Sequence, residues 1–127
     1  ELQYAYVKDG HISIRERIED VLVSAKQSLP VGIIVNELVT NSLKYSFEEG
    51  AAGTVDISVC REGSTHLAIE VSDNGVGMAN DIVEHRKYGF GLTLVEGYAK
   101  QYDGHMSITN NGGTRVRVVL ELDGESA

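Results

Sequence analysis

The chain has only one cysteine among its 127 residues, and no apolar stretch in it approaches the roughly 18 residues that a transmembrane helix needs. The single thiol, Cys60, excludes an internal disulfide, and its place in an alternating apolar run indicates a strand residue. The first residues lack the pattern of a secretory signal peptide. These absences fit a reducing compartment, so the sequence predicts a cytoplasmic location, in the cytosolic part of a soluble or membrane-anchored protein.

Positive charge is scarce as well. The chain has 11 Lys and Arg against 19 Asp and Glu, a formal net charge of -8 and a pI of about 4.9. This balance argues against nucleic acid or an anionic membrane as the main partner. It still permits a small anionic ligand, because a nearby lysine, a metal ion or the N-terminus of a helix can oppose the overall charge.

Length and composition predict a single globular domain over residues 1–127, with 42% hydrophobic residues to form its core. Because the sequence starts without a methionine, we expect a fragment of a longer protein. We expect the fragment to be a monomer.

Apolar periodicity predicts the elements. Helical spacing predicts a first helix over 26–46, with Pro30 in its first turn. It predicts a second helix that starts near Leu92 and ends at Gly104. Alternation of apolar and polar residues predicts strands over 2–7, 12–18, 21–23, 54–60, 66–72, 105–109 and 114–122. Turn residues lie at 9–10, 62–64 and 110–113. The fold class is therefore a two-layer α+β sandwich, with a mixed, mainly antiparallel sheet packed on one side by helices.

A row of polar side chains lies on the first predicted helix. Glu37, Asn41, Lys44 and Tyr45 are spaced so that they share one face of an α-helix. An amide oxygen suits Mg²⁺, a carboxylate can hold a metal-bound water or act as a base, and a lysine neutralises phosphate. Taken alone, such a row is more often a solvated helix face.

Two glycine-containing segments follow. Asp73-Asn-Gly-Val-Gly77 comes directly after a predicted strand, where a carboxylate can accept a hydrogen bond from an exocyclic amine and glycines allow a close approach to a flat ring. A plain turn is the alternative. Gly89-Phe-Gly91 precedes the second helix, whose free N–H groups can bind phosphate. It lacks the third glycine of a Rossmann fingerprint and the Gly-Lys-Ser/Thr of a P-loop. The polar stretch 79–88 before it has the composition of a mobile lid.

The order and spacing of these segments resemble the ATP-binding domain of the GHKL superfamily, which has the Bergerat fold. The N box is similar to 36–46, and the three glycine boxes to 73–77, 89–92 and 113–114. Within the superfamily the chain resembles the catalytic domain of a two-component sensor histidine kinase near the HWE group. It departs from that pattern in three ways. The stretch 79–88 contains no Phe-rich box, and Glu37 stands where many kinases have Asn. Asn36 stands where true HWE kinases have a histidine.

The resemblance implies ATP and Mg²⁺ as ligands. It implies that Asn41 and Glu37 lie at the metal, that Glu37, Asn41 and Lys44 are catalytic, and that Asp73 binds the adenine amine. Lys87, or its neighbour Arg86, would reach the γ-phosphate, although solvated loop charges are the alternative. The full set of implied nucleotide-binding residues is Asn41, Lys44, Tyr45, Asp73, Gly75, Gly77, Met78, Lys87, Gly89, Phe90, Gly91, Leu92 and Thr114.

The implied reaction is transfer of the ATP γ-phosphoryl group to a histidine on a separate dimerisation domain, with a response regulator as the next partner and a homodimer as the full-length state. None of the histidines at 11, 66, 85 and 105 has the helical setting of an acceptor. Two alternatives stay open: an anti-sigma-factor serine kinase of the same fold, and a non-catalytic nucleotide-sensing module.

Overall fold

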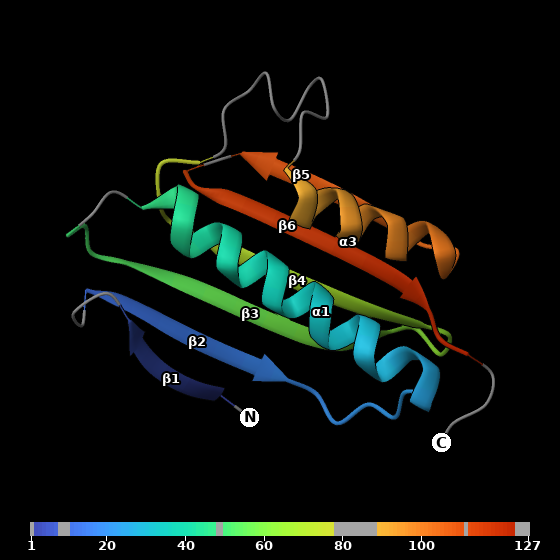
Figure 1. Ribbon diagram of the computed structural model, residues 1–127. Helices are drawn as coiled ribbons and strands as arrows, with labels where there is room; N and C mark the ends of the chain where they lie inside the picture. Colours follow the sequence, from blue (N-terminus) through green and yellow to red (C-terminus); the bar gives the residue numbers. More distant parts are fainter. Residues whose placement is uncertain (1, 8–10, 48–49, 78–88, 111, 124–127) are drawn as a thin grey trace.

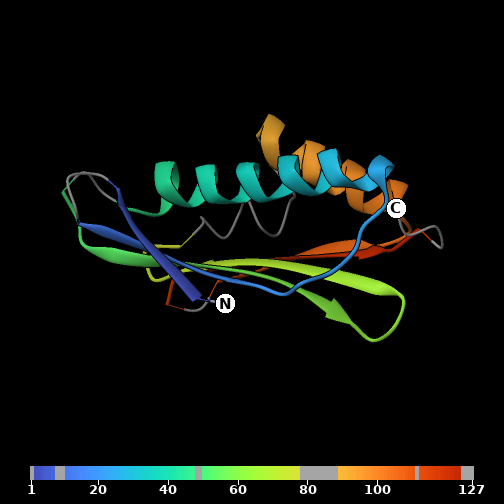
Figure 2. The ribbon, with the colours of Figure 1, turned by 90° about the horizontal axis from the view of Figure 1, so that it is seen from below.

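The computed structural model describes residues 2–7, 11–47, 50–77, 89–110 and 112–123. In this part of the chain both helices cover the same face of one sheet (Figures 1 and 2). The helical elements are α1 (Ala25–Asn41), continued by a π-helical turn (Ser42–Ser46), and α3 (Phe90–Gln101). The strands are β1 (Leu2–Val7), β2 (Ile12–Ile18), β3 (Gly53–Glu62), β4 (His66–Asp73), β5 (His105–Asn110) and β6 (Thr114–Glu121).

The sheet has the strand order β1-β2-β3-β4-β6-β5. Only β2 and β3 pair in parallel, because α1 lies between them in the chain and crosses over the sheet; the other neighbours are antiparallel. The predicted two-layer α+β sandwich with a mixed, mainly antiparallel sheet is confirmed. No helix in the described ranges is long and apolar enough to cross a membrane.

The core lies between the sheet and the two helices. Alternate residues of three neighbouring strands point toward the helices, as the period-two pattern predicts. The buried apolar residues of this core include Val55, Ile57 and Val59 on β3, Leu67, Ile69 and Val71 on β4, Val116, Val118 and Leu120 on β6, Ile34 and Leu38 on α1, Leu92, Val95 and Ala99 on α3, Ile12 on β2, and Phe47.

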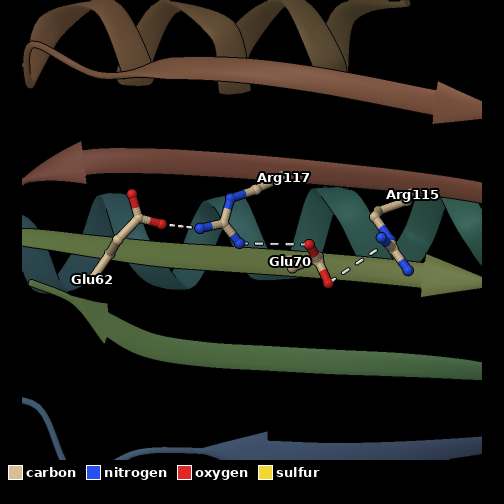
Figure 3. A network of polar contacts seen from close by, with 4 residues as sticks. All are labelled: Glu62, Glu70, Arg115 and Arg117. Carbon is tan, nitrogen blue, oxygen red and sulfur yellow. Dashed lines mark hydrogen bonds and ion pairs between the residues drawn. The ribbon is translucent and has the colours of Figure 1, made fainter.

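The other face of the sheet carries no helix in the described structure (Figure 3) and is mostly polar, apart from the paired buried residues Ala68 and Val119. Arg117 of β6 pairs with Glu62 at the end of β3 and lies 3.6 Å from Glu70 of β4, and Arg115 lies 3.9 Å from Glu70. Ion pairs this exposed contribute about 1 kcal/mol or less each. They explain instead why this face is compatible with water.

The predicted strand at 21–23 is wrong. Val21 and Val23 do pack against the core, which accounts for the apolar pattern, but they pair with none of the strands in the described part of the chain. Ser24 then begins α1: its Oγ accepts from the N–H of Gln27 at 3.2 Å and donates to Asp123 at 2.6 Å. The segment is an extended connection that ends at a helix N-cap.

The predicted place of Pro30 in the first helical turn is also wrong, since Pro30 is the sixth residue of α1. A proline there removes the N–H that would bond to the carbonyl of Lys26. The hydroxyl of Tyr102, at the end of α3, lies 3.4 Å from that carbonyl and donates to it. A contact between the two helices therefore replaces the lost bond within α1.

Gly104 does follow α3, but it is not the left-handed residue of the cap. Asp103 has the positive φ, 52°, and Gly104 donates its N–H to the carbonyl of Ala99 at 2.7 Å. A Cβ at Gly104 would lie 1.7 Å from the backbone oxygen of Val119 on β6. Glycine is required because α3 meets the sheet there at backbone distance.

We expect Gly104→Ala to lower the free energy of unfolding by about 2–3 kcal/mol, because the new methyl group forces α3 away from β6. Gly97→Ala is the matched control. Gly97 is an exposed helical residue with open space around its Cβ position, so this change should raise stability by about 0.5–1 kcal/mol. Urea denaturation measures both, and a neutral Gly104→Ala would contradict the packing argument.

Candidate functional site

The polar segments singled out in the sequence meet at one end of the molecule. The end of α1, the loop after β4 and the β5–β6 connection lie on the left of Figure 1, and α3 starts nearer the middle of the view. They are far apart in the chain, and the sheet order brings them together because β4, β6 and β5 are consecutive neighbours.

Asp73, the last residue of β4, holds several of these segments together. Its Oδ2 accepts from the hydroxyl of Ser42 at 2.8 Å. Its Oδ1 accepts from the N–H groups of Gly75 at 3.0 Å and Thr114 at 3.2 Å. The side chain is buried, yet an ionised carboxylate has about four acceptor positions. Three are filled by described residues, so one acceptor position remains on Oδ2.

The loop after Asp73 is fixed against the helix. The N–H of Val76 donates to the carbonyl of Ser46 at 2.8 Å, and a Cβ at Gly75 would lie 2.1 Å from the same oxygen. Gly77 has a φ of 84°, in the left-handed region. The close approach that requires Gly75 is thus to the protein's own backbone.

Helix α1 presents Glu37 and Asn41 to the start of α3. A Cβ at Gly91 would lie 2.4 Å from Oε2 of Glu37 and 3.8 Å from Nδ2 of Asn41. The glycine therefore makes room for both polar groups. Nδ2 of Asn41 is buried and has no hydrogen-bond partner among the described residues.

Lys44 and Tyr45 do not continue the predicted row. The α-helix ends at Asn41 and the next turn is π-helical, with i→i+5 bonds, so α-helical spacing does not hold there. Both side chains are exposed, Tyr45 to 71%. The prediction of one continuous α-helical stripe is wrong beyond Asn41, although both residues stay at this end of the molecule.

The N-terminus of α3 is open. Gly89 caps it without a side chain, and the first helical bond runs from the N–H of Thr93 to the carbonyl of Gly89. The N–H groups before Thr93 therefore have no acceptor within the helix. Phe90 is 83% exposed, whereas the side chain of Leu92 is buried in the core, so only its backbone faces the site. The predicted lid at 79–88, with Arg86 and Lys87, and Met78 lie outside the described residues.

Comparison with known proteins identifies the family of this domain. Residues 26–124 match the model of the histidine kinase-, DNA gyrase B-, and HSP90-like ATPases. The chain belongs to this family. The resemblance inferred from the four sequence boxes is thereby confirmed.

The relatives are histidine kinases. Blue-light-activated histidine kinase 2 of Erythrobacter litoralis is 25% identical over 114 residues, which are 89% of this chain and 33% of that protein. Sensor histidine kinase/phosphatase LytS of Staphylococcus aureus is 33% identical over 72 residues, 56% of this chain and 11% of that protein. The chain thus spans a third or less of these curated relatives.

A solved structure has the same fold. The Erythrobacter litoralis EL346 blue-light activated histidine kinase superposes with a TM-score of 0.81 at 24% identity, covering 89% of this chain and 36% of that one. The predicted catalytic domain of histidine-kinase type is confirmed by this agreement of family, relatives and fold.

The residues present fit a magnesium ion that takes most of its ligands from elsewhere. The described structure has no group of three or more His, Cys, Asp or Glu side chains able to hold a metal. Mg²⁺ is commonly bound by one or two protein oxygens together with water and phosphate. The buried amide end of Asn41 without a partner, next to the carboxylate of Glu37, matches that need when the amide is turned to present its oxygen.

Two residues of this ATPase site were missed by sequence reasoning. Ser42 follows Asn41 directly and has α-helical φ and ψ angles, so it lies on the buried face of the helix one turn after Leu38, where its hydroxyl reaches Asp73. Asn110, predicted as a hairpin residue, accepts from the Thr114 hydroxyl at 3.3 Å and lies against the Cβ position of Gly77. A local signal for Ser42 was its spacing of four and eight residues from Leu38 and Ile34, which puts it on the buried face of the helix. The approach of Asn110 to Gly77 joins distant segments, so no local signal distinguishes it.

A cavity of about 190 Å³ lies beside Asp73 and is lined by Ser72, Asp73, Thr109, Gly113, Thr114 and Arg115. Ser72 and Thr109 pair across the sheet with Arg115, whose side chain stands on the uncovered face in Figure 3. The cavity is therefore on the other side of the strands from Asn41.

We expect Asp73→Ala to lower the free energy of unfolding by about 3 kcal/mol, since the N–H groups of Gly75 and Thr114 and the buried hydroxyl of Ser42 lose their acceptor. Asp73→Asn should cost about 1 kcal/mol or less. Its amide oxygen can accept from Gly75 and Thr114, and the Ser42 hydroxyl can turn to accept from its NH₂. Urea denaturation separates the two changes, and equal losses would contradict this hydrogen-bond scheme.

Proposed function

We propose that this domain binds ATP with Mg²⁺ and donates the γ-phosphoryl group to a histidine of another domain. One observation carries the proposal: among the described residues, Asp73 keeps an acceptor position on Oδ2 next to Ser42, and the buried amide of Asn41 has no partner and lies beside Glu37 near the start of α3. The first suits a base amine, and the second suits a metal and phosphates.

Each residue then has a role. Asp73 accepts from the adenine amine, with Gly75, Gly77 and Thr114 shaping the loop around it. Asn41 supplies a magnesium ligand and Glu37 orients a metal-bound water or the acceptor. When bound, the ion neutralises phosphate charge. The backbone of Gly89, Phe90, Gly91 and Leu92 presents N–H groups to the phosphates.

The exposed side chains at the rim of the site complete the assignment. Lys44 and Tyr45 can turn toward phosphate oxygens from the π-helical turn, because neither is packed in the core. Lys87 and Met78 stay in the proposal on the basis of the sequence resemblance.

A histidine acceptor is favoured by the relatives' names, which are those of histidine kinases. We propose accordingly that the full protein is a cytosolic or membrane-anchored homodimer whose dimerisation domain carries that histidine and whose partner is a response regulator. His11 lies in a turn and His66 and His105 are the first residues of β4 and β5, so none of these three lies on a helix as the expected acceptor does. An anti-sigma-factor serine kinase remains the second candidate, since it would use the same nucleotide site.

Purified domain should bind ATP at micromolar to millimolar affinity in the presence of Mg²⁺ and should show little autophosphorylation. Asn41→Ala should weaken Mg²⁺-dependent binding about tenfold, because the metal loses a protein ligand. Asn36→Ala, an exposed residue of the same helix, is the control. Isothermal titration with and without Mg²⁺ measures both. The absence of a signal at millimolar ATP would rule the proposal out.

In the intact protein, Glu37→Gln should reduce phosphotransfer more than nucleotide binding, because the carboxylate acts on the reacting groups. Asp73→Asn should do the reverse, since it replaces an acceptor facing the base with a donor. Radiolabelled autophosphorylation measures the phosphotransfer rate of each variant, and titration measures its affinity for the nucleotide. Equal effects on both would remove the proposed division of roles.

A further inference from the structure

Ser42 is a buried serine, 7% exposed, whose hydroxyl bonds directly to the carboxylate of Asp73 at 2.8 Å. A serine in a helix commonly donates to the carbonyl one turn earlier. Here Ser42 lies on the buried face of the helix, one turn after Leu38, and its hydroxyl bonds to the end of β4 instead. The contact joins the helix layer to the sheet at the point where the base is proposed to bind.

The direction of this hydrogen bond follows from counting protons. The two N–H groups of Gly75 and Thr114 can only donate, and both point at Oδ1 of Asp73. An ionised carboxylate has no proton to give, so the hydroxyl of Ser42 must donate to Oδ2. The hydroxyl oxygen then keeps only lone pairs.

The wall formed by Ser42 and Asp73 therefore offers acceptors alone. One position remains on Oδ2, and the lone pairs of the Ser42 oxygen lie next to it. An amine donor in direct contact is matched by this arrangement. A carbonyl oxygen in the same place would face acceptors and leave them unpaired, which is the kind of mismatch that gives strong discrimination.

We propose that Ser42 is a positioning residue that sets base selectivity: its hydroxyl fixes the Asp73 carboxylate as an acceptor and makes the site prefer a 6-amino purine over a 6-oxo purine. The inference rests on the proposed nucleotide-binding function. It adds to that function a helix residue, Ser42, that takes no direct part in phosphoryl transfer.

The test compares ATP with ITP, which differs at the 6-position of the base. Titration of the domain with each nucleotide and Mg²⁺ should show that Ser42→Ala weakens ATP binding about fivefold and changes ITP binding less than about twofold. A purely structural role for Ser42 would weaken both nucleotides by the same factor. An equal loss, or no loss for ATP, overturns the inference.

Two further variants keep the outcome clear. Ser42→Cys retains a weak donor and should restore part of the preference for ATP over ITP. If the alanine variant does not fold, the ratio of ATP to ITP affinity is measured on the cysteine variant instead. Ser58→Ala, on β3 opposite Glu70, should leave the ratio unchanged. If the wild-type domain binds neither nucleotide, the proposed function fails; if it prefers ATP and the ratio is insensitive to Ser42, only this inference fails.

Discussion

The site depends on the buried carboxylate of Asp73. It accepts from the helix through Ser42, from its own loop through Gly75, and from β6 through Thr114. A buried charge is costly unless it is fully hydrogen-bonded, and these three donors meet most of that need. The same bonds hold the end of α1, the loop after β4 and the start of β6 in one arrangement. The acceptor position left over is the feature on which base recognition is proposed to rest.

The helix layer is adapted to this carboxylate. Helix α1 is regular as far as Asn41 and then widens into a π-helical turn. Ser42 faces inward because it continues the buried face of Ile34 and Leu38, and the wider turn after it ends with the Ser46 carbonyl at the N–H of Val76. It also leaves Lys44 and Tyr45 on the surface. A π-helical turn in a helix is often found at a functional site, and here its hydrogen bonds show why.

Much of the fold was predictable because its elements have strong periodic patterns. The strands with Val55, Ile57 and Val59 and with Leu67, Ile69 and Val71 were predicted from alternation, and α1 and α3 from helical spacing. Errors arose where a distant contact replaced the local rule. Tyr102 compensates for Pro30 inside α1, and the backbone of Val119 explains Gly104. Val21 and Val23 have a strand's pattern but no strand beside them.

The sequence by itself determined the fold class, the family through its four ordered boxes, and the identity of Asp73, Asn41 and Glu37 as the groups to examine. These depend on residue type and spacing, which are local. The tertiary structure alone decided that Ser42 bonds to Asp73, that Gly91 makes room for Glu37, and that the helical row ends at Asn41. Such facts depend on which distant backbones meet and on one widened helical turn, because a hydrogen bond between segments 31 residues apart leaves no periodic trace in the chain.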